Sequence, residues 1–299
     1  MGRPALSATR AIEMLNFLAS HPVEVFTLSE LATRLEINVA STHAVLGALE
    51  DSGYVIRHAT HKTYGLGPAV VALGNAALER HRSIDVAREE MERLESQLGL
   101  EILATVRIGD AMVAVARTGR PAGSGASLQV GQRVPLRPPL GSIFVAWDSE
   151  AGIDRWLASS GSNASPEERR HHRDTLAPIR ERGYSVGLEA PVRTQLGVVV
   201  AGLADEPHAA HLRASMNHLI ADLGHGDYQL DAVERGRTYQ VSLIAAPVFD
   251  AAGRVSLVLS LLGFRAGLTA DEVQKHGDRL REAGLRVTRA TGGRIRDAD

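Results

Sequence analysis

The stretch TLSELATRLEINVASTHAVLGALEDSGYVIR, residues 27–57, decides the fold of the first part of this chain. Thr27 and Glu30 have the spacing of a capping box, in which a hydroxyl and a carboxylate bond each other's backbone N–H groups and open a helix. Asn38 is a typical N-cap for the helix that follows. Only residues 36–38 separate the two helices. A link this short indicates a helix-turn-helix.

The second of these helices has one apolar face and one face of small residues. Four side chains recur at the i, i+3, i+4 and i+7 spacing of a buried stripe, namely Thr42, Val45, Leu46 and Leu49. The opposite face then carries Ala40, His43, Ala44 and Gly47, with Ser41 at its edge. Such a face fits deeply into the major groove of DNA, where alanine methyls touch thymine and Ser41 and His43 bond base edges or phosphates.

Flanking segments predict a winged helix around this pair. A helix at 8–20 carries Ala11, Leu15 and Leu18 on one face, with Ile12 beside them. The segments 54–58 and 64–67 predict a hairpin around a polar turn. Candidate DNA contacts combine the caps, the second helix, the hairpin and upstream arginines: Arg3, Arg10, Thr27, Asn38, Ala40, Ser41, Thr42, His43, Arg57, His61 and Lys62.

The alternative for this part of the chain is a small helical bundle that binds other proteins. Up to residue 75 it contains five basic residues against six acidic ones. The formal net charge of the whole chain is −2, so bulk charge does not hold it on nucleic acid. From the pattern alone both interpretations remain open.

Length and composition exclude several classes of protein. At 299 residues the chain suits two domains, and 44% hydrophobic with 23% charged residues excludes disordered and fibrous proteins. No apolar run approaches the ~18–20 residues of a membrane helix, and the first residues lack the apolar core of a secretion signal. The absence of cysteine excludes disulfides, thiol nucleophiles and thiolate metal sites. We therefore expect a cytoplasmic protein.

The remainder predicts a second domain with mixed helices and strands. An apolar stripe predicts a linker helix at 68–82, and an amphipathic helix follows at 83–99. Two antiparallel strand pairs are expected, at 101–108 with 111–118 and at 241–250 with 254–263. Further helices are expected at 141–147, 166–183 and 269–290. For the less clear interval 191–239 the pattern suggests a strand at 198–204 and a helix at 207–224.

Several stretches resemble one family in its own order along the chain. SATRAIEMLNFLASHP (7–22), the stretch 27–57 and KTYGLGPAVVALG (62–74) resemble the winged helix of IclR-type transcriptional regulators. VGQRVPLRPPLGSIFVAW (130–147), RERGYSV (180–186) and IAAPVFDAAGRVSLVLSLLG (244–263) resemble that family's effector-binding module.

The resemblance implies an α+β protein with three parts. These are a winged helix-turn-helix at 1–67, a linker helix at 68–82 and a GAF-like α/β effector domain with an antiparallel sheet at 83–299. An insertion is expected near 191–239, where relatives have a short connection. The resemblance also implies homodimers or dimers of dimers and ligand-dependent control of a catabolic operon, with repression as the expected mode.

Matching motif to motif, the resemblance implies an effector site at Pro139, Leu140, Gly141, Ser142, Leu243, Ser260 and Leu262. Relatives that bind small oxo-acids tend to carry cysteine or serine where Leu243 and Leu262 stand. An apolar wall with few polar groups suits an aromatic acid. Its acid group would bond Ser260 and the backbone N–H groups of the 139–142 loop, beside the start of the next helix. The alternative is that these strand residues only form sheet core.

Signals for metal or catalytic chemistry are weak. His208, His211 and His218 with Asp222 have helical spacings that could hold a metal ion. The adjacent pair at 171–172 points in different directions on a helix. No serine lies in a nucleophile elbow, and no glycine pattern matches a phosphate loop. We expect neither an enzyme nor a cofactor. A metal-dependent sensor or enzyme with an accessory DNA-binding module, or an interaction scaffold, is the alternative.

Overall fold

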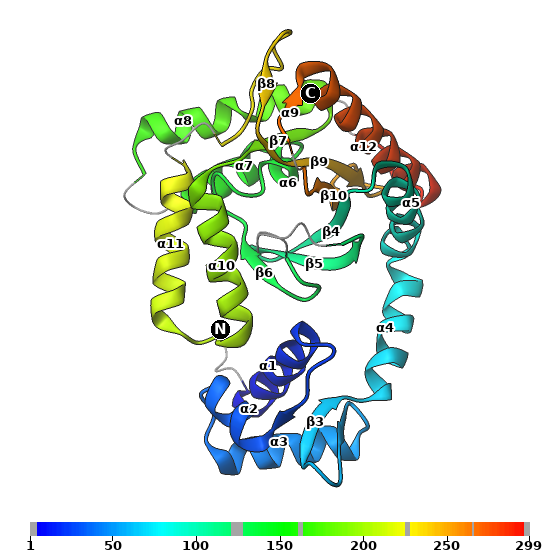
Figure 1. Cartoon of the computed structure of the whole chain (residues 1–299), viewed down its shortest axis with the longest axis vertical. Helices are drawn as coiled ribbons and strands as arrows, with labels where there is room; N and C mark the ends of the chain where they lie inside the picture. Colours follow the sequence, from blue (N-terminus) through cyan, green and yellow to red (C-terminus); the bar gives the residue numbers. More distant parts are fainter. Residues whose placement is uncertain (1–4, 121–127, 161–163, 225–227, 265, 296–299) are drawn as a thin grey trace.

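The computed structural model describes residues 5–120, 128–160, 164–224, 228–264 and 266–295. These residues form a winged helix, a linker helix and a larger domain built on an antiparallel sheet (Figure 1). The α+β fold class predicted from the sequence is confirmed. None of the described helices combines the length and the apolar character that crossing a bilayer requires.

The winged helix follows the predicted helix-turn-helix closely. Its elements are α1 (Leu6–Ser20), β1 (Phe26–Thr27), α2 (Leu28–Arg34), α3 (Val39–Asp51), β2 (Val55–Arg57) and β3 (Thr63–Leu66). The capping box forms, since the Glu30 N–H donates to Thr27 Oγ1 at 3.3 Å and the Thr27 N–H donates to Glu30 Oε2 at 2.7 Å. Asn38 Oδ1 accepts the Ser41 N–H at 2.9 Å and opens α3. The pairing of β1 with β3 was not predicted.

The predicted face of α1 packs in the winged-helix core, with Leu18 buried and Ala11 and Leu15 partly buried, and only Ile12 departs from the prediction. Met14, Phe17 and Leu18 are buried, whereas Ile12 is 58% exposed. Because α3 and β3 pack on α1 from the side of Met14 and Phe17, these two residues join the core and Ile12 stays in solvent. Helical spacing alone gives the period of a stripe, and the neighbours decide which stripe is covered.

The linker helix α4 (Pro68–Arg80) joins the two domains and buries none of its residues. Its apolar side chains stay in solvent, with Val71 65% and Leu73 57% exposed. The next helix, α5 (Arg82–Leu98), buries Ala87, Met91 and Leu94 against the larger domain. The linker therefore carries an uncovered apolar face within a single chain.

The central sheet has six antiparallel strands in the order β6-β5-β4-β10-β9-β7. They are β4 (Glu101–Ile108), β5 (Ala111–Thr118), β6 (Arg133–Pro135), β7 (Ser185–Leu188), β9 (Val241–Phe249) and β10 (Val255–Leu262). Both predicted strand pairs are confirmed, β4 with β5 and β9 with β10. The short strands β8 (Thr238–Tyr239) and β11 (Leu268–Thr269) pair with each other.

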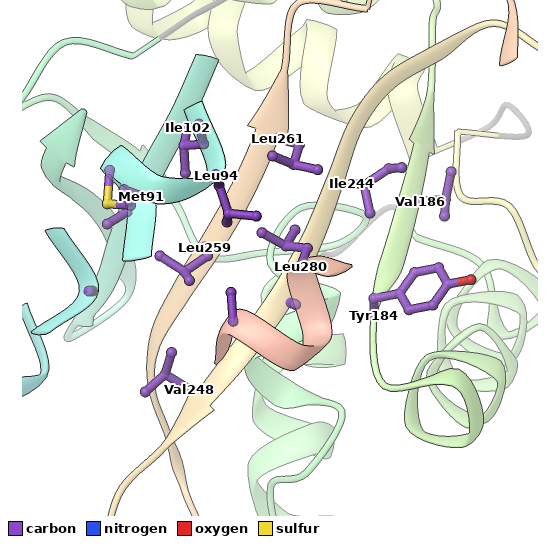
Figure 2. Packing of buried hydrophobic residues seen from close by; sticks show 14 of the residues in the cluster. Met91, Leu94, Ile102, Tyr184, Val186, Ile244, Val248, Leu259, Leu261 and Leu280 are labelled. Carbon is purple, nitrogen blue, oxygen red and sulfur yellow. The ribbon is translucent and has the colours of Figure 1, made fainter. Parts of the chain in front are cut away.

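Two helices, α5 and α12 (Ala270–Ala290), cover one face of the sheet and enclose the main core (Figure 2). Ile244, Leu259 and Leu261 point from the strands into this core, against Met91 and Leu280 from the helices. Successive side chains of a strand point to opposite faces. The residues between these core residues therefore face the other side of the sheet.

Short helices cover part of the opposite face: α6 (Ser142–Val145), α7 (Glu150–Ala158), α8 (Pro166–Asp174) and α9 (Leu176–Arg182). The helix predicted at 141–147 is thus reduced to the four residues of α6. The helix α7, whose Ile153 and Trp156 are buried, was not predicted from the sequence. Together these helices leave the β6–β5 side of this face to be covered by other segments.

A hairpin of two helices covers the remaining part of this face. The strand predicted at 198–204 was wrong, because this segment is helical. The valine run predicted as a strand at 198–204 lies inside α10 (Pro191–Asp205), which packs against α11 (Ala210–Gly224). Leu196 and Val200, one helical turn apart, are buried, whereas Val198 is 61% exposed. Figure 1 shows the hairpin reaching from the sheet towards the winged helix. The predicted helix at 207–224 corresponds to α11.

Candidate functional sites

A cavity of about 160 Å³ lies between the sheet and the segments that cover it. Every residue that the sequence predicted for an effector site lines this cavity: Pro139, Leu140, Gly141, Ser142, Leu243, Ser260 and Leu262. These residues come from one loop and two strands that are about a hundred positions apart in the chain. The structure therefore brings the whole predicted set together in one cavity.

The floor of the cavity is one face of four neighbouring strands. Ser260 of β10 lies opposite Leu103 of β4 on one side and Ala245 of β9 on the other. Ser185 of β7 pairs with Ala245 in turn. Leu103, Ser185 and Thr105 were not predicted as site residues. The alternation of the strand predicted at 101–108 could have indicated Leu103 and Thr105, because i and i+2 share a face, whereas no strand was predicted at Ser185.

One edge of the cavity is the loop that precedes α6. Gly141 adopts a positive φ of 80°, and a Cβ at this position would collide with the Leu136 side chain. The buried Trp156 indole donates a hydrogen bond to the Leu140 carbonyl at 3.0 Å and fixes the loop from outside. Arg137 Nη2 donates to Asn217 Oδ1 at 2.8 Å and links the loop to α11. Burial lowers the pKa of the Arg137 guanidinium.

The polar groups of the cavity wall are few. The Ser142 hydroxyl donates to Gln229 Oε1 at 3.3 Å, and Arg193 Nη1 donates to the Tyr228 hydroxyl at 3.0 Å. Within the part of the chain that the structure describes, no hydrogen bond engages the Ser260 hydroxyl, which therefore remains available to a ligand. Three of these residues were not predicted as site residues from the sequence: Arg193, Tyr228 and Gln229. No local pattern shows that this segment lies over the sheet.

The expected anion site at the start of the helix after Gly141 needs a correction. A carboxylate is stabilised at a helix N-terminus by the aligned peptide dipoles of several turns. With only four residues, α6 supplies about one turn. The positive charge at the cavity comes instead from the Arg193 side chain.

A second candidate site is the outer surface of the winged helix. Ala40, His43 and Ala44 of α3 are exposed, and Figure 1 shows α3 on the side of the winged helix remote from the sheet. Arg10 Nη1 donates to Ser41 Oγ at 3.1 Å, which positions this half-buried serine. The wing adds three exposed basic or imidazole side chains, Arg57, His61 and Lys62. Such an arrangement can place α3 in a major groove with the wing beside it.

Three of the predicted DNA contacts have other roles in the structure. Thr42 is fully buried, and its hydroxyl donates to the Asn38 carbonyl at 3.1 Å, so it does not reach the surface. Thr27 and Asn38 use their side-chain oxygens as helix caps. The remaining candidate, Arg3, lies outside the described residues.

The histidines that the structure describes do not converge on one point. Across the described ranges, no group of three histidine, aspartate or glutamate side chains is arranged to hold a metal ion. His218 Nε2 lies 3.3 Å from Asp222 Oδ2 on α11, whereas His208 lies 3.8 Å from Glu13 of the winged helix. On α8, His172 is buried and His171 is exposed, as adjacent helical residues are expected to be.

Comparison with known proteins covers both domains. The family model of the IclR helix-turn-helix domain matches residues 7–58, and that of the bacterial transcriptional regulator IclR C-terminal domain matches residues 75–199. The DNA-binding transcriptional repressor YiaJ of Escherichia coli (strain K12) is 24% identical over 306 residues, which is 99% of this chain and 92% of that protein.

Solved structures agree with the fold. The crystal structure of an IclR transcriptional regulator from Alicyclobacillus acidocaldarius has a TM-score of 0.65 at 22% identity, with 97% of this chain and 100% of that chain covered. An IclR homolog from Microbacterium hydrocarbonoxydans, solved with 4-hydroxybenzoate, has a TM-score of 0.60 at 16% identity, with 95% and 99% covered.

Proposed function

This chain belongs to the IclR family of bacterial transcriptional regulators, and from that premise we propose that it represses a catabolic operon under the control of a small aromatic acid. Its homologues are transcriptional regulators, which are not enzymes. Repression is supported by the relative YiaJ, which is a transcriptional repressor. As a regulator of bacterial DNA, it would act in the cytoplasm.

The cavity carries the proposal of an aromatic effector. At about 160 Å³ it is close to the ~150 Å³ of an apolar cavity that holds one benzene ring. Leu243 and Leu262 contribute apolar side chains where an oxo-acid would need hydroxyl or thiol partners. Burying a polar group without a hydrogen bond costs on the order of several kcal/mol. A ring against the same wall gains about 25 cal/mol per Å² of buried apolar surface.

The homolog solved with 4-hydroxybenzoate supports this choice by analogy, since that protein has the same fold and holds a single-ring acid. Ser260 Oγ is the polar group that would bond the ring substituent or the acid from the sheet. The residues proposed to contact the effector remain those predicted from the sequence: Pro139, Leu140, Gly141, Ser142, Leu243, Ser260 and Leu262.

The experiment is titration calorimetry of the full chain with benzoate, 4-hydroxybenzoate and phenylacetate beside glyoxylate and pyruvate. We expect the aromatic acids to bind, to raise the melting temperature and to change the affinity for DNA upstream of the protein's own gene. Ser260→Ala should weaken the response, while Ser256→Ala, on the same strand near its start, serves as the control. Tight binding of pyruvate or glyoxylate without binding of any aromatic acid overturns the proposal.

For DNA we propose that α3 enters the major groove and that the wing contacts the backbone. The contacts would come from Ala40, Ser41 and His43 in the groove, with Arg10, Arg57, His61 and Lys62 on phosphates or the minor groove. The domain limits remain those predicted, 1–67, 68–82 and 83–299, with 191–239 as an insertion. The exposed apolar face of α4 supports a homodimer, with a dimer of dimers as the higher assembly.

A further inference from the structure

The first turn of α10 places one arginine in the wall of the cavity. Arg193 is half-buried, and its Nη1 atom donates to the Tyr228 hydroxyl at 3.0 Å. The described residues offer it no ion-pair partner, because no carboxylate lies within 4.0 Å of the guanidinium. A phenol hydroxyl uses one of the five N–H donors of the side chain, so donors remain for a ligand.

The rest of the described cavity wall is uncharged. Besides Arg193, its polar side chains are hydroxyls and one amide, namely Thr105, Ser142, Ser185, Tyr228, Gln229 and Ser260. Removing a charge from water is costly unless an opposite charge or several hydrogen bonds compensate it. A guanidinium beside an apolar cavity is therefore suited to bind a carboxylate, which it can hold with two parallel hydrogen bonds.

We propose that Arg193 binds the carboxylate of the effector and that Tyr228 orients the guanidinium. This inference rests on the proposed function, and it names the acid-binding residue and the ligand class, a monocarboxylate on one apolar ring. The carboxylate lies at the α10 side of the cavity and the ring lies over the strands, with Leu103, Leu243 and Leu262 around it. Arg193, which would set this specificity, lies in the segment 191–239. The family model matches only the first part of that segment, residues 191–199.

The test compares an acid with its neutral isostere, benzoate with benzamide, by calorimetry on the full chain. The wild type should prefer benzoate, and Arg193→Gln should lose about tenfold to a hundredfold in benzoate affinity, as for loss of a hydrogen bond to a charged group. Benzamide affinity should stay nearly unchanged in Arg193→Gln. Tyr228→Phe should weaken benzoate binding less, and Arg88→Gln, an exposed arginine of α5, should have no effect.

The outcomes separate this inference from the proposed function. Unchanged benzoate affinity in a folded Arg193→Gln variant overturns the role of Arg193 and leaves the aromatic effector intact. Equal affinity of the wild type for benzoate and benzamide also overturns it. Failure of the wild type to bind any single-ring compound overturns the proposed function itself.

The other end of α10 carries an independent observation. Asp205, its last residue, accepts hydrogen bonds from two side chains of the winged helix, His21 Nε2 at 3.0 Å and Arg34 Nη1 at 3.2 Å. His21 is 7% exposed, and its Nδ1 lies 2.8 Å from the Phe17 carbonyl. His208, just past α10, lies 3.8 Å from Glu13 of α1. The end of α10 therefore binds the turns that close α1 and α2.

One helix thus connects the effector cavity with the DNA-binding domain. Leu196 and Val200 line the effector cavity, and Val200 with Leu203 also lines the space next to Phe17 and Leu35 of the winged helix. The 15 residues of α10 span about 22 Å at 1.5 Å per residue. We infer that the contact of Asp205 with His21 and Arg34 is a clasp that fixes the winged helix on its own effector domain and couples it to the cavity.

The clasp can be tested without an effector, because the chain has no cysteine and two can be introduced for spin labels. Labels at Thr33→Cys on α2 and Ser215→Cys on α11 should give a narrow distance distribution that Asp205→Asn broadens. Asp222→Asn, on α11 and paired only with His218 among described residues, is the matched control. An unchanged distribution in Asp205→Asn overturns the clasp.

A second measurement tests the coupling with benzoate as the probe. The measured quantity is the ratio of the affinities for the upstream DNA with and without benzoate. We expect this ratio to differ from one in the wild type and to be close to one in Asp205→Asn, while benzoate still binds to the variant. An unaltered ratio in Asp205→Asn overturns the coupling. Absence of benzoate binding concerns the proposed function and leaves the spin-label result to decide the clasp.

Discussion

Individual side chains on α3 are proposed to recognise the DNA sequence. Ser41 is half-buried and receives a hydrogen bond from Arg10 of α1, so its hydroxyl has a fixed position. His43 is exposed on the same face. Side chains that bond base edges set the sequence preference, whereas side chains that bond phosphates set the affinity for all sequences.

The double variant Ser41→Ala/His43→Ala should therefore lose discrimination between the upstream DNA and random DNA. Arg57→Ala should weaken binding to both and reduce the dependence of affinity on salt, because one phosphate contact is lost. Gel shifts at several salt concentrations measure both effects. If the double variant still prefers the upstream DNA to random DNA, α3 is not the helix that recognises the DNA sequence.

Two capping glutamates should make stability depend on pH. The backbone N–H and then the hydroxyl of Thr27 lower the pKa of Glu30 below its ordinary 4.5, and Thr269 does the same for Glu272 of α12. A carboxylate with a lowered pKa in the folded state stabilises the protein above the unfolded-state pKa. This contribution is lost as the pH falls through the folded value, which lies below 4.5.

Glu30→Gln and Glu272→Gln keep a hydrogen-bond acceptor but cannot titrate. Each variant should be slightly less stable than the wild type at neutral pH, and the difference should disappear in acid. Urea unfolding across this pH range measures it, with Glu50→Gln on α3, outside any capping box, as the control. A difference that persists unchanged in acid would contradict the assignment.

At the scale of elements, α12 owes its position on the sheet to glycine. A Cβ at Gly284 would lie 2.5 Å from the Pro247 carbonyl oxygen of β9, closer than atoms can approach. A glycine here lets the helix backbone approach the strand directly. The same helix buries Val273, Leu280 and Val287 in the main core.

Gly284→Ala should therefore destabilise the protein by about 1–3 kcal/mol, the usual cost of overpacking a core. Gly74→Ala, in the exposed α4 with no atom within 4 Å of the added Cβ, should instead be neutral or stabilising by up to about 1 kcal/mol. Thermal unfolding of the two variants gives the comparison. Equal stability of both would mean that α12 moves away from β9 at little cost.

At the scale of the whole molecule, one winged helix offers few cations for DNA. When a dimer holds two winged helices together, binding of the first to its half-site raises the effective concentration of the second at the other half-site. The dimer therefore binds DNA more tightly than one winged helix does. The apolar face of α4, with Val71 and Leu73 exposed, has no cover within the described chain. A second copy can bury this face against its own α4.

Val71→Glu/Leu73→Glu should convert the protein to a monomer and weaken its binding to the upstream DNA. Val198→Glu, on α10 and exposed to a similar extent at 61%, is the matched control and should leave the dimer intact. Light scattering at micromolar concentration measures the assembly. A wild-type monomer under these conditions would contradict the proposed dimer.

The sequence by itself determined the elements whose signals are local. The capping box at Thr27, the N-cap Asn38 and the strand alternation around Ser260 depend on neighbours within a few residues, so they could be predicted. The family's motif order then indicated which loop and strands meet at the cavity.

Tertiary structure alone decided the role of the segment 191–239. Its valine run has strand propensity, yet Leu196 and Val200 gain burial against α11 only as a helix, and packing outweighs propensity. The same packing places Arg193 at the cavity and Asp205 beside His21, which is 184 positions earlier in the chain. Contacts between residues so distant in sequence depend on how whole elements pack, and no local pattern records them.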